Sequence, residues 1–168
     1  MQLTHYNTQF PKHTFPITII CDDVNTALNI GSLFRICDAF GVEKIIFCGN
    51  NISIGRKMTK TSRSTEKHVQ YKIVSDISEV ITEYKDSHQL IGLEITSNSK
   101  PLKTFKFNTH KPIALILGNE NFGISENILK QLDTTVHITM YGHNSSMNVV
   151  QAASIALYEI TKQYIYSK

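Results

Sequence analysis

Short apolar runs alternate with longer segments whose apolar residues recur at helical spacing. The run at residues 17–21 is uninterrupted and rich in β-branched residues, which is typical of a strand buried on both faces of a parallel sheet. Comparable short runs occur at residues 44–48, 71–74, 90–95, 112–117 and 136–140. Each of these runs is predicted to be a strand.

The segments between these runs are predicted to be helices. Residues 27–41 end at a glycine and bring four apolar side chains close to one face: Leu28, Leu33, Ile36 and Phe40. Residues 76–89 and 125–132 have similar patterns, and residues 147–164 form a longer amphipathic segment with a packing face made of Val149, Ala153, Ala156 and Ile160. The alternation predicts an α/β fold with a mainly parallel sheet flanked by helices.

Two stretches, residues 49–69 and 97–111, do not fit the alternation. Each is longer than the usual connection in an α/β fold, and long loops often carry functional residues. The chain has 168 residues, enough for one ordinary domain, and it shows no internal repeat or linker. Residues 1–168 are therefore predicted to form a single domain.

Charge is distributed unevenly along the chain. The net charge is only +3, but residues 56–72 contain six Lys or Arg and one Glu, which leaves eleven basic and thirteen acidic residues elsewhere. Lys57, Lys60 and Arg63 recur at three-residue spacing with Ser and Thr between them, a pattern suited to nucleic-acid phosphates rather than base edges. The segment is predicted to contact RNA, and the alternative is a mobile basic loop without a partner.

The sequence does not support a metal site, a membrane span, a secretion signal or several common catalytic and nucleotide-binding motifs. The three cysteines have neither CxxC nor zinc-finger spacing, so buried reduced thiols are predicted and no metal site is. No apolar run approaches the length of a membrane span or a secretion signal, which favours the cytoplasm. GxGxxG, Walker A, GxSxG and HExxH motifs do not occur.

Three polar segments at predicted strand ends or helix starts could carry chemistry: residues 29–35, 118–123 and 141–148. Each also has a purely structural interpretation. Asn29 would be a helix N-cap and Arg35 a surface partner of Asp38. The second segment would be a left-handed turn capped by Ser125, and the third a solvated loop capped by Ser or Asn.

Taken together, the three segments read NxGxxxR, LGNExxGxS and SxNVxxAAxxALYE, in that order, from Asn29 to Glu159. In this they resemble the SpoU, or TrmH, branch of the SPOUT RNA methyltransferases. The resemblance implies a SPOUT domain with a deep C-terminal trefoil knot, a homodimer, and S-adenosylmethionine-dependent 2′-O-ribose methylation of structured RNA. The apparent lack of an appended RNA-binding domain favours transfer RNA over ribosomal RNA.

The resemblance also implies roles for individual residues. The cofactor would contact Thr96, Leu117, Gly118, Ile138, Met140, Met147 and Asn148. The catalytic group would be Arg35, supported by Asn29, Glu120, Ser146 and Asn148. Because a guanidinium keeps its proton inside proteins, electrostatic stabilisation by Arg35 is expected in preference to general-base catalysis.

Further expectations and alternatives follow from the same residues. The dimer is expected to pack through the last helix, where Ala152, Ala153 and Ala156 permit close approach. One alternative is a catalytically silent RNA-binding relative. Another is a flavodoxin-like ligand-binding domain, but that fold needs a phosphate loop after the first strand, where Asp22 and Asp23 would repel phosphate.

Overall fold

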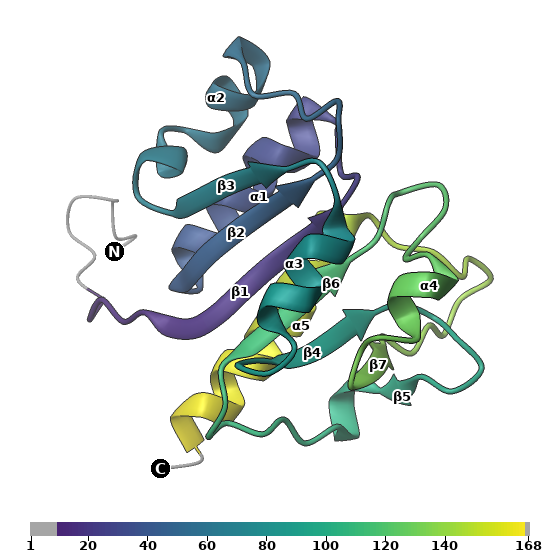
Figure 1. The fold of residues 1–168 in the computed structure, drawn as a ribbon. Helices are drawn as coiled ribbons and strands as arrows, with labels where there is room; N and C mark the ends of the chain where they lie inside the picture. The colour runs from purple at the N-terminus through teal and green to yellow at the C-terminus, as the bar shows by residue number, and fades with distance from the viewer. Residues whose placement is uncertain (1–9, 167–168) are drawn as a thin grey trace.

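A computed structural model of the protein describes residues 10–166, which form one seven-stranded sheet with helices on both faces (Figure 1). All strand pairings are parallel, in the order β3-β2-β1-β6-β4-β7-β5. The strands are β1 (Phe15–Asp22), β2 (Val42–Cys48), β3 (Gln70–Val74), β4 (Gln89–Leu93), β5 (Lys100–Pro101), β6 (Ile113–Leu117) and β7 (Thr134–His137). The predicted α/β class with a mainly parallel sheet is confirmed.

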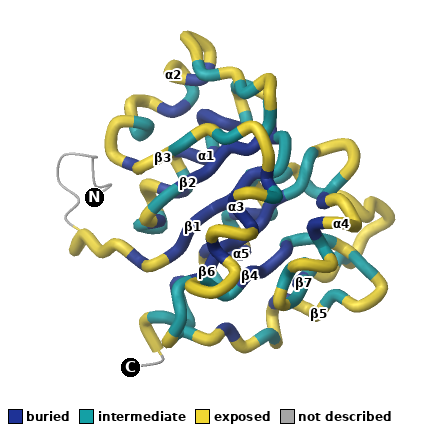
Figure 2. The backbone as a smooth tube through the Cα atoms, in the orientation of Figure 1, coloured by how far each residue is buried: buried dark blue, intermediate teal, exposed yellow. Residues whose placement is uncertain are grey.

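The central strands are buried on both faces because helices cover both (Figure 2). Helices α1 (Ala27–Ala39) and α5 (Val149–Tyr166) pack on one face, and α3 (Ile77–Tyr84) with the short α4 (Glu126–Leu129) packs on the other. Each face forms its own apolar cluster, and neighbouring residues of β1 alternate between the two. Two-sided burial explains the uninterrupted apolar runs in the sequence.

The buried face of α1 differs from the predicted one. Leu28 is 68% exposed, whereas Ile30, Leu33, Phe34 and Cys37 are fully buried against the sheet. Positions i, i+3, i+4 and i+7 from Ile30 make a complete helical stripe, which includes a cysteine and an aromatic residue. The prediction of Leu28 as a core residue was therefore wrong.

The two stretches that were predicted to be loops contain short elements. Residues 49–69 form α2 (Arg56–Ser62) and the 3₁₀ turn η1 (Thr65–Lys67), which pack on α1. Residues 97–111 contain β5 and η2 (Leu102–Thr104). Predicted strand 136–140 also begins earlier and ends at His137, so residues 138–148 are an irregular connection between β7 and α5.

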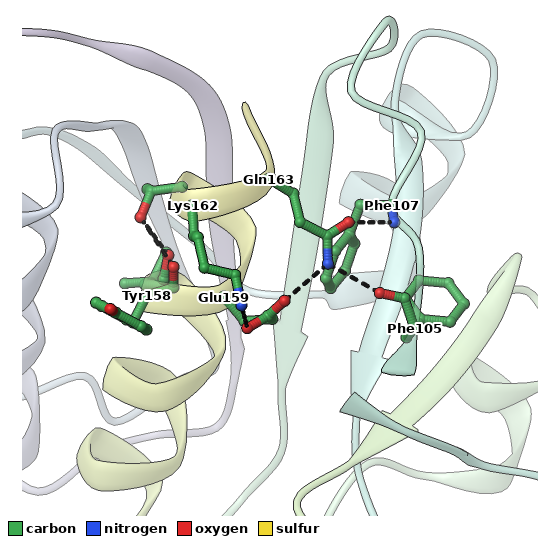
Figure 3. A network of polar contacts seen from close by, with 8 residues as sticks. Phe105, Phe107, Tyr158, Glu159, Lys162 and Gln163 are labelled. Atoms are coloured by element: carbon green, nitrogen blue, oxygen red, sulfur yellow. Dashed lines mark hydrogen bonds and ion pairs between the residues drawn. The ribbon is translucent and has the colours of Figure 1, made fainter. Parts of the chain in front are cut away.

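A hydrogen-bond network joins the segment after η2 to α5 (Figure 3). The Gln163 amide accepts from Phe107 N at 3.0 Å and donates to Phe105 O and Glu159 Oε1, both at 2.9 Å. Burial alone would raise the pKa of Glu159, but hydrogen bonds from Lys162 and Gln163 outweigh it and lower that pKa. The network fixes an otherwise irregular segment to the last helix.

The three thiols, Cys21, Cys37 and Cys48, are free and buried. Burial raises the pKa of each of them, so they are poor nucleophiles. This confirms the prediction of buried reduced thiols. No helix within residues 10–166 combines the length and apolar character that crossing a membrane requires.

Candidate active site

The carboxyl ends of four neighbouring strands meet at one edge of the sheet, because β1, β6, β4 and β7 are adjacent and parallel. The segments that follow β4, β6 and β7 surround a cavity of about 660 Å³ together with the start of α5. That volume lies in the range of small-molecule sites. The cavity is the candidate ligand site of the chain.

The structure places every residue that was predicted to contact a cofactor in the wall of this cavity. These residues are Thr96, Leu117, Gly118, Ile138, Met140, Met147 and Asn148. Glu120 and Ser146, predicted as supporting polar groups, line it as well. The wall thus combines apolar side chains with backbone groups at strand ends, a combination that fits a nucleoside-containing ligand.

Asn29 does not line the cavity but links two residues that do. Its Nδ2 donates to Glu120 Oε1 at 2.5 Å, and its Oδ1 accepts from Asn148 Nδ2 at 3.2 Å. Thr26 also donates to Glu120 Oε1, at 3.2 Å. The N-cap of α1 is Thr26, so the interpretation of Asn29 as the cap was wrong, and its side chain is available to join all three polar segments.

Asn148 has two functions in this network. Its Oδ1 accepts from Val150 N at 2.9 Å and so caps the first turn of α5, while its amide group reaches Asn29. The capping role expected from a purely structural interpretation and the contact with the site are therefore compatible.

The turn after β6 depends on two glycines that lie against each other. A Cβ on Gly118 would be 2.4 Å from Gly123 C and 2.5 Å from Ile124 N, and Gly123 has a φ of +66°. A side chain at position 118 would therefore first displace the turn itself. A valine there would thus disturb the turn in addition to taking up space in the cavity.

Arg35 is not part of the cavity. It lies six residues after Asn29, about 9 Å along the helix axis and about 120° around it. Its side chain is exposed, and among residues 10–166 no ion pair involves it, including the expected pair with Asp38. It follows Gly31 by four residues and so lies on the side of α1 where α2 packs.

The predicted RNA-contact residues lie together on that same part of the molecule. Lys57 and Lys60 are exposed on α2, and Arg63 is its exposed C-terminal cap in the left-handed conformation, with a φ of 53°. Met58 and Ser62 point inward and fix the helix on α1. The structure thus places these cations on α2, which packs on the helix that carries Arg35, and not around the cavity.

Two ionisable residues of the cavity wall were not predicted from the sequence. Glu94 and His137 both line the cavity, directly after β4 and at the end of β7. Ser99 Oγ donates to Thr96 O at 2.8 Å and lies 2.9 Å from His137 Nδ1, a contact whose donor is set by the tautomer of the histidine. A lone carboxylate in the apolar run LIGLEI was the available signal for Glu94.

Metal chemistry has no ready set of ligands in the part of the chain that the structure describes. Within residues 10–166, no group of three or more His, Cys, Asp or Glu side chains is placed to hold a metal ion.

The chain is similar to known proteins over most of its length. Residues 16–158 match the model of the SpoU rRNA Methylase family. A Staphylococcus saprophyticus protein named for the TrmH family of tRNA/rRNA methyltransferases is 27% identical over 150 residues, which cover 88% of this chain and 59% of that protein. The chain thus spans about three fifths of the length of this curated relative.

Solved structures show the same fold. The A. aeolicus TrmH/SpoU tRNA modifying enzyme superposes with a TM-score of 0.82 and 26% identity, covering 93% of this chain and 79% of that one. The SpoU methyltransferase AviRb from Streptomyces viridochromogenes, in complex with AdoMet, gives a TM-score of 0.80 and 26% identity, covering 93% and 60% of the two chains.

Proposed function

The chain belongs to the SpoU rRNA methylase family, and from this we propose that it is an S-adenosylmethionine-dependent methyltransferase acting on a ribose 2′-hydroxyl of structured RNA. The observation that carries the proposal is the cavity at the strand ends, where Glu120, Asn29 and Asn148 join the three sequence motifs through hydrogen bonds. Membership of the family also implies the deep C-terminal trefoil knot.

The cavity supports the choice of cofactor. Leu117, Ile138 and Met140 offer an apolar surface to a flat base, and backbone N–H and C=O groups at the strand ends can pair with its polar edge. S-adenosylmethionine supplies a methyl group that its sulfonium charge already activates. The AdoMet complex of AviRb supports the same ligand for this chain.

Arg35 is proposed as the catalytic residue. A ribose hydroxyl that loses its proton carries negative charge on oxygen, and a guanidinium, which stays protonated, can stabilise that charge with two donors at once. The Asn29–Glu120–Asn148 network would hold the surrounding polar groups in position, so that the hydroxyl lies in line with the methyl group.

A homodimer accounts for the position of Arg35. The side chain does not line its own cavity, so we propose that the partner subunit's Arg35 completes each site. Exposed apolar residues on α5, Ile155, Tyr158 and Ile165, follow one another at helical spacing and are proposed as part of the subunit contact.

The substrate is proposed to be tRNA in preference to rRNA, and the location the cytoplasm, where such RNA is found. The A. aeolicus neighbour is a tRNA modifying enzyme, which supports this choice. Lys57, Lys60 and Arg63 are proposed to hold RNA phosphates next to Arg35.

The proposal is tested by comparing nucleosides from the RNA of cells with and without the protein by mass spectrometry. A 2′-O-methylated nucleoside should be lost with the gene and restored by wild type. In vitro, Arg35→Ala should lower methyl transfer by about a hundredfold or more and leave cofactor affinity unchanged, and Arg35→Lys should rescue little.

Two results would contradict it. Calorimetry that shows no binding of S-adenosylmethionine or S-adenosylhomocysteine at millimolar concentration would contradict the proposed cofactor. Binding of cofactor and RNA with no methylated ribose in any cellular RNA would instead favour the catalytically silent RNA-binding protein.

A further inference from the structure

Glu94 lies directly after β4, in the cavity wall, and belongs to none of the three sequence motifs. We propose that Glu94 is a positioning residue whose carboxylate fixes the turn at residues 118–124, and through that turn both the cofactor cavity and Glu120. The inference rests on the proposed function for its consequence in methyl transfer, but the contacts themselves are independent of it.

The carboxylate joins two segments that are distant in sequence. Glu94 Oε2 accepts from Ile124 N at 3.1 Å, and Oε1 accepts from Ile95 N at 2.9 Å. One oxygen therefore secures the end of the turn after β6, and the other fixes the carboxylate relative to its own strand. Charge-assisted bonds of this kind are about twice as strong as neutral ones.

The turn is held at its other end by Asn119. Asn119 Nδ2 donates to Asp23 O at 3.0 Å and to Asp23 Oδ2 at 3.1 Å. Backbone bonds between Asn119 and Gly123 close the turn, at 2.9 and 3.2 Å. Glu120 lies between these two attachments, so loosening either one changes the position from which it contacts Asn29.

Glu94 also fills the space beside Gly123. A Cβ at Gly123 would lie 2.3 Å from Glu94 Oε2, so a side chain there would push the carboxylate out of its present position. The carboxylate has no cationic partner among the described residues, as the ion pairs found there involve other groups. The carboxylate instead contacts two backbone amides, Ile95 N and Ile124 N, and each of them donates to a different carboxylate oxygen.

This requirement distinguishes Glu94 from a residue that only fills space. Glutamine has nearly the same shape but offers one acceptor oxygen and one NH₂ group, so one of the two amides, Ile95 N or Ile124 N, would lose its partner. Glu94→Gln should therefore give an intermediate defect, and Glu94→Ala a full one.

The first experiment measures amide hydrogen exchange of residues 118–124 in the cofactor-free protein. Glu94→Ala should speed exchange in this turn by at least tenfold while the central strands stay protected. The same variant should weaken S-adenosylhomocysteine binding by about tenfold to a hundredfold in calorimetry, with Glu94→Gln between it and wild type. Glu126→Gln, which changes an exposed carboxylate just beyond the turn, is the matched control.

A double-mutant cycle tests the pairing with Gly123. Gly123→Ala should lower the melting temperature more in wild type than in the Glu94→Ala background, because removal of the carboxylate leaves room for the added methyl group. Equal effects in both backgrounds would overturn the pairing.

The outcomes separate this inference from the proposed function. If wild type binds cofactor and Glu94→Ala changes neither exchange nor affinity, the role of Glu94 is wrong and the proposed function stands. If wild type binds no cofactor, the proposed function fails, while the exchange measurement still decides whether Glu94 holds the turn.

Discussion

At the scale of single residues, the packing of α2 on α1 explains why a glycine, Gly31, stands in the middle of α1. A glycine in the middle of a helix costs about 1 kcal/mol relative to alanine, so its presence needs a reason. A Cβ on Gly31 would lie 2.6 Å from Met58 O and 3.0 Å from Ser62 N. The glycine of the NxGxxxR motif thus permits close approach of the α2 backbone, rather than contact with a ligand.

Gly31→Ala is therefore expected to displace α2 while leaving the cofactor cavity intact. The free energy of unfolding should fall by about 1–3 kcal/mol, the usual cost of an overpacked site. Urea denaturation measures this change. RNA affinity should fall as well, because the basic helix moves, while S-adenosylhomocysteine affinity should stay at the wild-type value.

Gly55→Ala provides the control for Gly31→Ala, since a Cβ at Gly55, the residue before α2, meets no atom within 4 Å. Loss of cofactor binding in Gly31→Ala, with α2 still protected from hydrogen exchange, would contradict the assignment of Gly31 to helix packing.

At the scale of elements, α2 turns a basic stretch of sequence into a surface. Met58 and Ser62 face α1, and this orientation leaves Lys57 and Lys60 exposed on the outside. Ser62 donates to the Glu66 carboxylate, which ties the helix to η1 and lowers the pKa of Glu66. Glu66, the one acidic residue in the basic segment at residues 56–72, is thereby held by the hydroxyl group of Ser62.

Replacing Lys57, Lys60 and Arg63 together by alanine should weaken RNA binding to a similar degree for all sequences. Each lost phosphate contact should reduce the slope of log affinity against log salt by roughly 0.7 to 0.9. Titrations at several salt concentrations measure the slope, and cofactor affinity serves as the internal control. A slope equal to that of wild type would mean that RNA binds to another surface.

The elements that the sequence predicts well are those whose burial is uniform. Strands β1 and β6 are buried along nearly their whole length, so their apolar runs are unmistakable. Helix α2 and strand β5 were missed because they are short and mostly exposed, and their pattern depends on packing against α1 and β7. The local sequence does not contain those neighbours.

At the scale of the whole molecule, the small residues of α5 pack within one chain. Ala153 and Ala156 are fully buried against the protein's own core, so the expectation that they form the dimer contact was wrong. The exposed stripe on the same helix is instead formed by Ile155 and Tyr158 at 42% and 63% exposure, with Ile165 farther along.

The sequence predicts only those site residues that the ends of neighbouring parallel strands bring together. Parallel topology brings the predicted cofactor residues together, because the segments after β4, β6 and β7 leave the same edge of the sheet. The location of Arg35 was not predictable, since it depends on the rotation of α1 and on the proposed second chain. The lone carboxylate in the run LIGLEI marks Glu94 in the sequence, but its role was not predictable, because its hydrogen bond to Ile124 N crosses between two loops.

The proposed sharing of Arg35 between subunits makes a quantitative prediction for mixed dimers. Arg35→Ala keeps an intact cavity, and Gly118→Val keeps Arg35 but disrupts the turn at the cavity. Each protein alone should be inactive. In a mixed dimer, the Gly118→Val chain supplies Arg35 to the intact cavity of its partner, so one of the two sites works.

When the two variants are unfolded, mixed in equal amounts and refolded, about half of the dimers should be mixed, and activity should reach about a quarter of the wild-type value by two-fold symmetry. Circular dichroism checks that both variants fold, and mixing without refolding controls for residual activity. If Arg35 acts on the cavity of its own chain, no mixed dimer contains a complete site. Activity that stays at the level of the separate variants would therefore reject the shared site and leave Arg35 to act within one subunit.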